Sequence, residues 1–165
     1  MTQYKAPSET RIGHVHLKVS DIPRALEFYC ELLGLELITM YGDEAAFVSA
    51  GGYHHHIGLN TWYSKDAPPA ERNGVGLFHV AIVYPTRKDL ATIFRRLREN
   101  IYPMTGASDH GVSEALYLDD PDGNGVELYW DRPEEHWPRT PEGRVNMFTR
   151  RLDLEDLLTE LPNQD

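Results

Sequence analysis

One pattern of predicted elements occurs twice in this chain of 165 residues, and it constrains the fold more than any other feature. Each copy starts with a strand, continues with a helix and closes with further strands, which gives the order βαβββ. We place the first copy at about residues 11–63 and the second at about residues 77–132. The repeat predicts an α+β fold in which paired βαβββ modules form a curved mixed sheet around a cleft, with the helices outside.

The first copy opens with a strand over residues 11–19, in which polar and apolar side chains alternate. The alternation places His14 on the polar face of this strand. Asp21 is a suitable helix cap, and Gly34 marks the end of the helix. Three strand-like segments follow, at residues 35–40, 44–49 and 53–62.

The second copy repeats this order. Its first strand, over residues 77–83, carries His79, and Thr86 with Asp89 forms a capping-box-like start to the next helix. Two or three strands are predicted to close the copy, around residues 101–105, 115–118 and 126–130. His14 and His79 therefore occupy equivalent places in the two copies.

The last two strands are predicted to form a hairpin around residues 120–125, where Pro fixes φ and Gly, Asn and Asp tolerate positive φ. Because side chains alternate between the faces of a strand, Tyr117 and Glu127 lie on one face. The opposite face is apolar and carries Leu116, Leu118, Val126, Leu128 and Trp130. An acid in such a strand is rarely buried without a partner or a function.

The two copies are expected to make one domain over residues 11–132, joined by a linker rich in proline and glycine. A polar arm at residues 1–10 precedes this domain, and an extension at residues 133–165 follows it. Leucines in the extension predict a short amphipathic helix. Its apolar face either packs on the core or a dimer partner, or closes over the cleft as a lid.

Charge and composition exclude several classes of partner. The net charge is −10 and the isoelectric point about 5.2, which argues against nucleic acid and anionic membranes. We find neither a secretory signal nor a run long enough to cross a bilayer, so a cytoplasmic protein is expected. The lone Cys30 cannot form an internal disulfide.

Four predicted strands each carry one residue that can bind a metal ion, on the face opposite to their aliphatic residues. These residues are His14, His56, His79 and Glu127. Two imidazoles and one carboxylate are the ligands of the facial triad of non-haem Fe(II) enzymes, which leaves positions open for substrate and O2. Zinc or manganese uses similar ligands. A single histidine in a strand is more often structural, and we assign His16, His54, His55 and His136 to that class.

The motifs of the chain resemble the vicinal oxygen chelate superfamily, which includes glyoxalase I, extradiol catechol dioxygenases and bleomycin- and fosfomycin-resistance proteins. The resemblance covers about residues 11–130. It rests on residues 14–21, on Phe28-Tyr29, on Leu33-Gly34-Leu35 and on residues 120–128. These proteins share the paired-module fold around a metal-binding cleft, and they often form dimers.

Further positions resemble those of the single-domain extradiol catechol 2,3-dioxygenases. The resemblance implies that His14, His79 and Glu127 hold Fe(II), and that a catechol-type diol and O2 are the substrates. It implies that His56 acts as acid/base, a task suited to an imidazole near neutral pH. It further implies that His110 and Tyr117 donate hydrogen bonds to the substrate oxygens.

Two alternatives stay open. A metal-dependent lyase or isomerase such as glyoxalase I would use Mn, Zn or Ni in place of Fe(II), and it would carry a glutamate in the last strand of the first half. Residues 53–62 contain no glutamate. A metal-free drug-binding protein of the resistance type would need no metal ligands. The expected partners are small molecules and, in a homodimer or higher homo-oligomer, a second copy of the chain.

Overall fold

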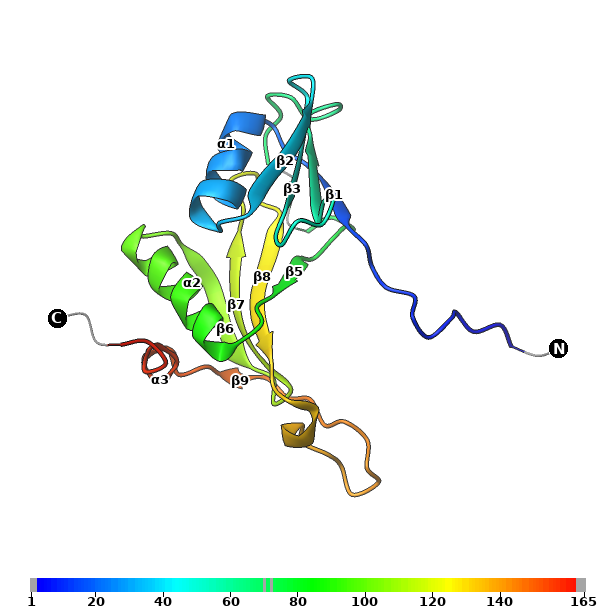
Figure 1. Ribbon diagram of the computed structural model, residues 1–165, viewed down its shortest axis with the longest axis vertical. Coiled ribbons are helices and arrows are strands. Elements are labelled where there is room, and N and C mark those ends of the chain that lie inside the picture. The colour runs from blue at the N-terminus through cyan, green and yellow to red at the C-terminus, as the bar shows by residue number, and fades with distance from the viewer. Residues whose placement is uncertain (1–2, 70, 72, 163–165) are drawn as a thin grey trace. The chain divides into compact units, whose positions relative to one another are not determined.

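The computed structural model describes residues 3–69, 71 and 73–162 of the chain (Figure 1). It divides into two compact units, Met1–Ala67 and Pro68–Asp165, and each unit is described by itself. Each unit contains one mixed sheet with the predicted βαβββ order, so the α+β prediction is confirmed. No helix among the described residues is both long enough and apolar enough to cross a membrane.

The sheet of the first unit has the strand order β1-β4-β3-β2. Strands β1 and β4 run parallel, and the other pairs are antiparallel. The elements of this unit are β1 (Val15–Lys18), α1 (Ile22–Leu26), the π-helix η1 (Glu27–Leu32), β2 (Glu36–Tyr41), β3 (Ala45–Ser49) and β4 (Ile57–Asn60).

Local sequence signals set the ends of the first helix as predicted. The Asp21 side chain accepts a hydrogen bond from the Arg24 N–H at 2.7 Å, and Pro23 lies in the first turn. Gly34 has φ +80°, a conformation that glycine adopts without strain. The π-helical turn over Glu27–Leu32 was not predicted, because the apolar spacing does not distinguish it from an α-helix.

The second unit contains five strands in the order β5-β8-β7-β6-β9, with β5 and β8 parallel and the other pairs antiparallel. Its elements are β5 (Val80–Val83), α2 (Arg87–Glu99), β6 (Met104–Asp109), β7 (Ser113–Asp119), β8 (Gly125–Asp131), the short helix η2 (Glu134–His136), β9 (Arg150–Arg151) and α3 (Leu154–Leu158).

The capping box of the second helix and the hairpin turn are both present. Thr86 accepts from the Asp89 N–H, and the Asp89 carboxylate accepts from the Thr86 N–H. In the turn, Asp120 Oδ1 accepts the N–H groups of Asp122 and Asn124, each at 2.9 Å. Gly123 takes φ +83°. The turn thus fixes the register of β7 and β8.

Several predicted boundaries are wrong by a few residues. The strand expected from residue 53 begins at Ile57, because Gly51 and Gly52, with φ +64° and +76°, form a turn and residues 53–56 after it are irregular. Ile101, where the next strand was expected to begin, is 89% exposed and has φ +53° in the turn after α2. Strand β6 therefore begins later than predicted, at Met104.

The extension packs within the second unit. Strand β9 pairs with β6, so it covers one edge of the sheet. The predicted short helix is α3, which lies beside α2 (Figure 1). Leu157 of this helix is buried, as are Leu152 before it and Leu161 after it, whereas Leu154 and Leu158 are partly buried.

Candidate functional site

The polar face of the β7–β8 hairpin holds the centre of the candidate site. Tyr117 lies directly opposite Glu127 in the strand register, which confirms that the two share a face. On the other face Leu116 and Leu128 are fully buried. The Tyr117 hydroxyl donates to Glu127 Oε1 at 3.1 Å. Burial, and then the negative charge of Glu127, raise the pKa of Tyr117 above its ordinary value, so the hydroxyl keeps its proton at neutral pH.

His79 reaches the same carboxylate from the neighbouring strand. It directly precedes β5, whose first residue pairs with Val126 of β8. A Cβ at Gly125 would collide with the carbonyl oxygen of Phe78, so glycine permits this close approach of the two chain segments. The His79 Nε2 atom lies 2.9 Å from Glu127 Oε2. Its Nδ1 atom is buried and has no hydrogen-bond partner among the described residues.

The His79–Glu127 contact has the length of a direct hydrogen-bonded ion pair, and this length is also compatible with two ligands of one metal ion. Two donor atoms that bind a metal ion at about 2.1 Å each and at about a right angle lie about 3.0 Å apart. The 2.9 Å between Nε2 and Oε2 fits this separation, and Glu127 Oε1 is held by Tyr117. An imidazole nitrogen and a carboxylate oxygen suit Fe(II), Mn or Zn.

His110 continues this chain of contacts. Its Nε2 atom lies 2.7 Å from the Tyr117 hydroxyl oxygen. Its Nδ1 atom lies 3.0 Å from the carbonyl oxygen of Phe148, which belongs to the C-terminal extension. A carbonyl oxygen only accepts, so the ring carries a hydrogen on Nδ1. His110, Tyr117, Glu127 and His79 therefore form one continuous set of polar contacts within the second unit.

A buried network of ion pairs lies next to His110. Glu114 is 4% exposed and accepts from Arg87 Nε at 2.8 Å and from Arg132 Nη2 at 2.7 Å. Arg132 also donates to Asp109, the residue before His110, at 2.5 Å. The hydrogen bond from Arg132 lowers the pKa of Asp109, against the opposing effect of burial. These ion pairs connect β6, β7 and the start of α2.

In the first unit, His56 lies directly before β4 and is fixed through Nδ1. This atom lies 2.8 Å from the Ser49 hydroxyl oxygen and accepts from the Ala50 N–H at 3.3 Å. An N–H only donates, so Nδ1 is an acceptor and the neutral ring carries its hydrogen on Nε2. His56 and His110 thus hold their hydrogens on different nitrogens.

His14 lies directly before β1, among other histidines of the first unit. Its ring centroid is 4.3 Å from that of His55, and His54 Nδ1 lies 2.7 Å from His55 Nδ1. Burial and then the charge of His14 lower the pKa of His16 and of His55. We expected a structural role for His55, and the structure places its ring in contact with that of His14 in a segment, residues 53–56, that is not a strand.

The predicted site residues thus fall in both units. His79, His110, Tyr117 and Glu127 lie together in the second, whereas His14 and His56 belong to the first. Among the described residues, no group of three or more His, Cys, Asp or Glu side chains could hold a metal ion in the structure as it stands. The predicted triad therefore stays a proposal, supported by its second-unit pair.

Five residues that hold the candidate groups were not predicted: Ser49, Arg87, Glu114, Arg132 and Phe148. Glu114 had a sequence signal, because it has the parity of Leu116 and is an acid on an apolar face. The Phe148 carbonyl had none, since every residue carries such a group.

Comparison with known proteins adds to this geometry. The family model of the Glyoxalase/Bleomycin resistance protein/Dioxygenase superfamily matches residues 11–128. The chain is 41% identical over 152 residues to catechol-2,3-dioxygenase of Bacillus subtilis strain 168. The aligned region covers 92% of this chain and 52% of that protein. It therefore spans about half the length of this relative.

A second relative and a solved structure agree with this match. Biphenyl-2,3-diol 1,2-dioxygenase 3 of Rhodococcus globerulus is 33% identical to this chain over 129 residues. The aligned region covers 76% of this chain and 67% of that protein. The crystal structure of a glyoxalase/dioxygenase from Nostoc punctiforme superposes with a TM-score of 0.65 at 19% identity, covering 81% of this chain and 99% of that one. The structural match concerns the fold alone.

Proposed function

Since the chain belongs to the glyoxalase/bleomycin resistance protein/dioxygenase superfamily, we propose that it is an Fe(II)-dependent extradiol dioxygenase that cleaves a catechol-type diol with O2. The observation that carries the proposal is the 2.9 Å approach of His79 Nε2 to Glu127 Oε2. The names of two dioxygenase relatives support the same reaction class.

In this proposal His14, His79 and Glu127 hold the metal ion. Two imidazoles and one carboxylate on one face leave the remaining coordination positions open. A bound Fe(II) supplies Lewis-acid binding of the two diol oxygens and one-electron chemistry with O2.

Tyr117 orients the carboxylate ligand. Its hydroxyl contacts Glu127 Oε1, so that Oε2 is the oxygen that faces His79. Because its pKa is raised, Tyr117 stays protonated and serves as a hydrogen-bond donor near the diol. His110 lies behind Tyr117 and donates from Nε2 only as an imidazolium, since its Nδ1 hydrogen faces the Phe148 carbonyl.

His56 is the proposed acid/base. The Ala50 N–H holds its Nδ1 as an acceptor, so the neutral ring carries its hydrogen on Nε2. The ring takes up a proton at Nδ1, where the Ser49 hydroxyl lies 2.8 Å away, and the imidazolium so formed is the acid that can deliver the Nε2 hydrogen to an oxygen. The Ser49 hydroxyl, buried beside it, fixes the plane of the ring. A group with this arrangement moves a proton without binding the metal.

The sequence of the first repeat favours this reaction over that of a glyoxalase I-like lyase. In the strand register of the first unit, β4 carries Gly58 at the place where β8 of the second unit carries Glu127. The first repeat therefore supplies no carboxylate at this place, and a fourth protein ligand is absent from it.

The test is anaerobic reconstitution with Fe(II), followed by a panel of catechols in an oxygen electrode. We expect O2 uptake and a coloured ring-fission product with at least one catechol. Substitution His56→Phe should keep the iron and lose most of the turnover, whereas His136→Phe, on a residue outside the site, should keep both. No uptake across the panel with iron bound would refute the proposal.

A further inference from the structure

We propose that the C-terminal segment, residues 145–161, is a positioning element for His110, in which the Phe148 carbonyl keeps the ring hydrogen on Nδ1 and directs Nε2 at Tyr117. The contacts on both ring nitrogens carry this inference: Phe148 O at 3.0 Å from Nδ1 and Tyr117 Oη at 2.7 Å from Nε2. Its catalytic consequence rests on the proposed function.

The carbonyl of Phe148 is the group that decides the tautomer. The one hydrogen of the Tyr117 hydroxyl can face either Glu127 Oε1 or His110 Nε2, so Tyr117 by itself leaves either His110 tautomer possible. The Thr149 hydroxyl, 3.3 Å from Nδ1, likewise adapts to either. A carbonyl only accepts, and it therefore favours the tautomer with hydrogen on Nδ1. In that neutral ring Nε2 carries no hydrogen and accepts the one hydroxyl hydrogen of Tyr117, which then no longer faces Glu127 Oε1.

Phe148 is held against the His110 loop from two sides. Its own N–H donates to the His110 carbonyl oxygen at 3.2 Å. Gly111, with φ +79°, provides the space for its ring: a Cβ at this position would lie 2.7 Å from Phe148 Cε1 and 2.8 Å from Pro138 Cγ. Strand β9 follows and pairs with Ser108 and Asp109, directly before His110.

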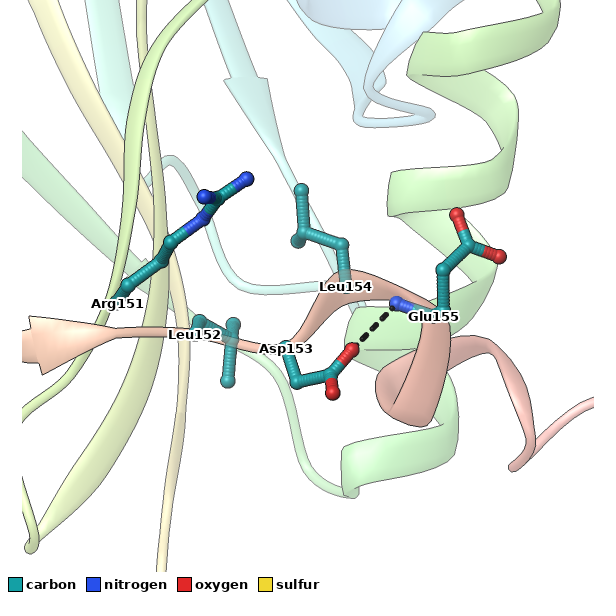
Figure 2. A pocket seen from close by; sticks show the side chains of 5 residues that line it. All are labelled: Arg151, Leu152, Asp153, Leu154 and Glu155. Atoms are coloured by element: carbon teal, nitrogen blue, oxygen red, sulfur yellow. Dashed lines mark hydrogen bonds between the residues drawn. The ribbon is translucent and has the colours of Figure 1, made fainter.

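The far end of the segment is anchored to α2. Arg87 donates to Asp156 at 2.7 Å and to Glu160 at 3.0 Å, while its Nε atom binds the buried Glu114. Leu157 of α3 is fully buried. Figure 2 shows how Asp153 caps α3, with its carboxylate accepting from the Glu155 N–H at 3.1 Å. The segment is therefore fixed at Phe148 and on its C-terminal side.

His56 provides an internal reference for this effect. A backbone donor, the Ala50 N–H, faces its Nδ1, whereas a backbone acceptor faces Nδ1 of His110. The same ring atom thus meets opposite partners in the two proposed catalytic histidines. One spectrum of the protein should show both tautomers.

The experiment is a two-bond proton–nitrogen NMR correlation of the histidine rings in the whole chain, free of paramagnetic metal, at a pH where the rings are neutral. We expect hydrogen on Nδ1 for His110 and on Nε2 for His56. Two variants weaken the positioning element: Gly111→Ala displaces Phe148, and the double variant Asp156→Asn/Glu160→Gln releases α3 from Arg87. In each, His110 should show a mixture of tautomers.

The matched control is Glu155→Gln. Glu155 also lies on α3 and faces Arg98 of α2. It is exposed, and its Oε1 atom lies 3.7 Å from Arg98 Nη1. It should leave the His110 tautomer unchanged. In the Fe(II) enzyme, the two positioning variants should lower kcat about 10-fold at an unchanged KM, the size expected for a group that orients another. The control should keep the native kcat.

The outcomes separate this inference from the proposed function. Hydrogen on Nε2 of native His110, or an unchanged tautomer in the folded variants, would overturn the positioning role even if the enzyme consumes O2. If Gly111→Ala does not fold, the double variant decides by the same criterion. The expected tautomers without O2 uptake would retain the positioning role and refute the dioxygenase.

Discussion

The two repeats share one strand pairing but carry different side chains at corresponding positions. In the second unit Tyr117 lies opposite Glu127, and in the first unit Phe47 lies opposite Gly58. The second repeat thus holds a hydroxyl and a carboxylate where the first holds a phenyl ring and no side chain. His14 and His79, in contrast, precede the first strand of both repeats.

For the proposed metal site, this difference accounts for an asymmetric set of ligands drawn from two similar repeats. The histidine is present twice, whereas the carboxylate and its tyrosine are present once, which gives two imidazoles and one acid. In the first repeat the space beside Gly58 is taken by the His16 ring, 3.0 Å from where a Cβ would lie. The variants below test this division between the repeats.

The largest effect is expected at Glu114. Its counterpart by register in the first repeat is Glu44, which is exposed, whereas Glu114 is buried between Arg87 and Arg132. Glu114→Gln should cost about 3–5 kcal/mol of unfolding free energy, because it leaves two partly buried guanidinium groups without their shared anion. Glu44→Gln should cost less than about 0.5 kcal/mol. Urea unfolding measures both, and equal losses would contradict the comparison.

An intermediate effect is expected when the second repeat is made to resemble the first. Tyr117→Phe removes the hydroxyl that contacts Glu127 and His110. We expect about a 10- to 100-fold lower kcat with iron still bound, as for other groups that orient a metal ligand. The reciprocal change, Phe47→Tyr, should leave kcat within twofold. Oxygen uptake measures kcat, and iron analysis shows whether each variant still binds the metal. A native rate in Tyr117→Phe would exclude the proposed role of the Tyr117 hydroxyl.

The smallest effect concerns pH. Asp109 has a lowered pKa through Arg132, so its stabilising contribution is complete above the ordinary value of 3.8 and is lost as the pH falls through the lower value in the folded state. The corresponding residue of the first repeat is Gly42. In acid titrations of unfolding free energy, Asp109→Asn should show a shallower dependence below pH 3.8 than the native chain. Identical curves would remove Asp109 from the network.

Much of this arrangement follows from local sequence patterns. The repeat, the helix caps at Asp21 and Thr86 and the shared face of Tyr117 and Glu127 depend on neighbouring residues, and the structure confirms them. Side-chain alternation needs no knowledge of distant contacts, which is why it succeeded for the hairpin.

The remainder depends on contacts between distant segments. Arg87 meets Asp156 and Glu160 only because β9 and α3 return to the sheet, and the spacing of these residues carries no signal. The contact of the Phe148 carbonyl with His110 also joins distant segments, and no residue type in the sequence signals it. The ends of strands also shifted, because glycines and the turn at Ile101 override the apolar pattern.

The central claim is that one metal ion is held by a histidine from each repeat and the single carboxylate. Its most direct test is the iron content after anaerobic reconstitution and removal of unbound Fe(II), measured for the native chain, His14→Ala and His16→Ala. We predict one iron per native chain, its loss in His14→Ala, and its retention in His16→Ala, two residues further along the same segment. Native iron content in His14→Ala would contradict the claim.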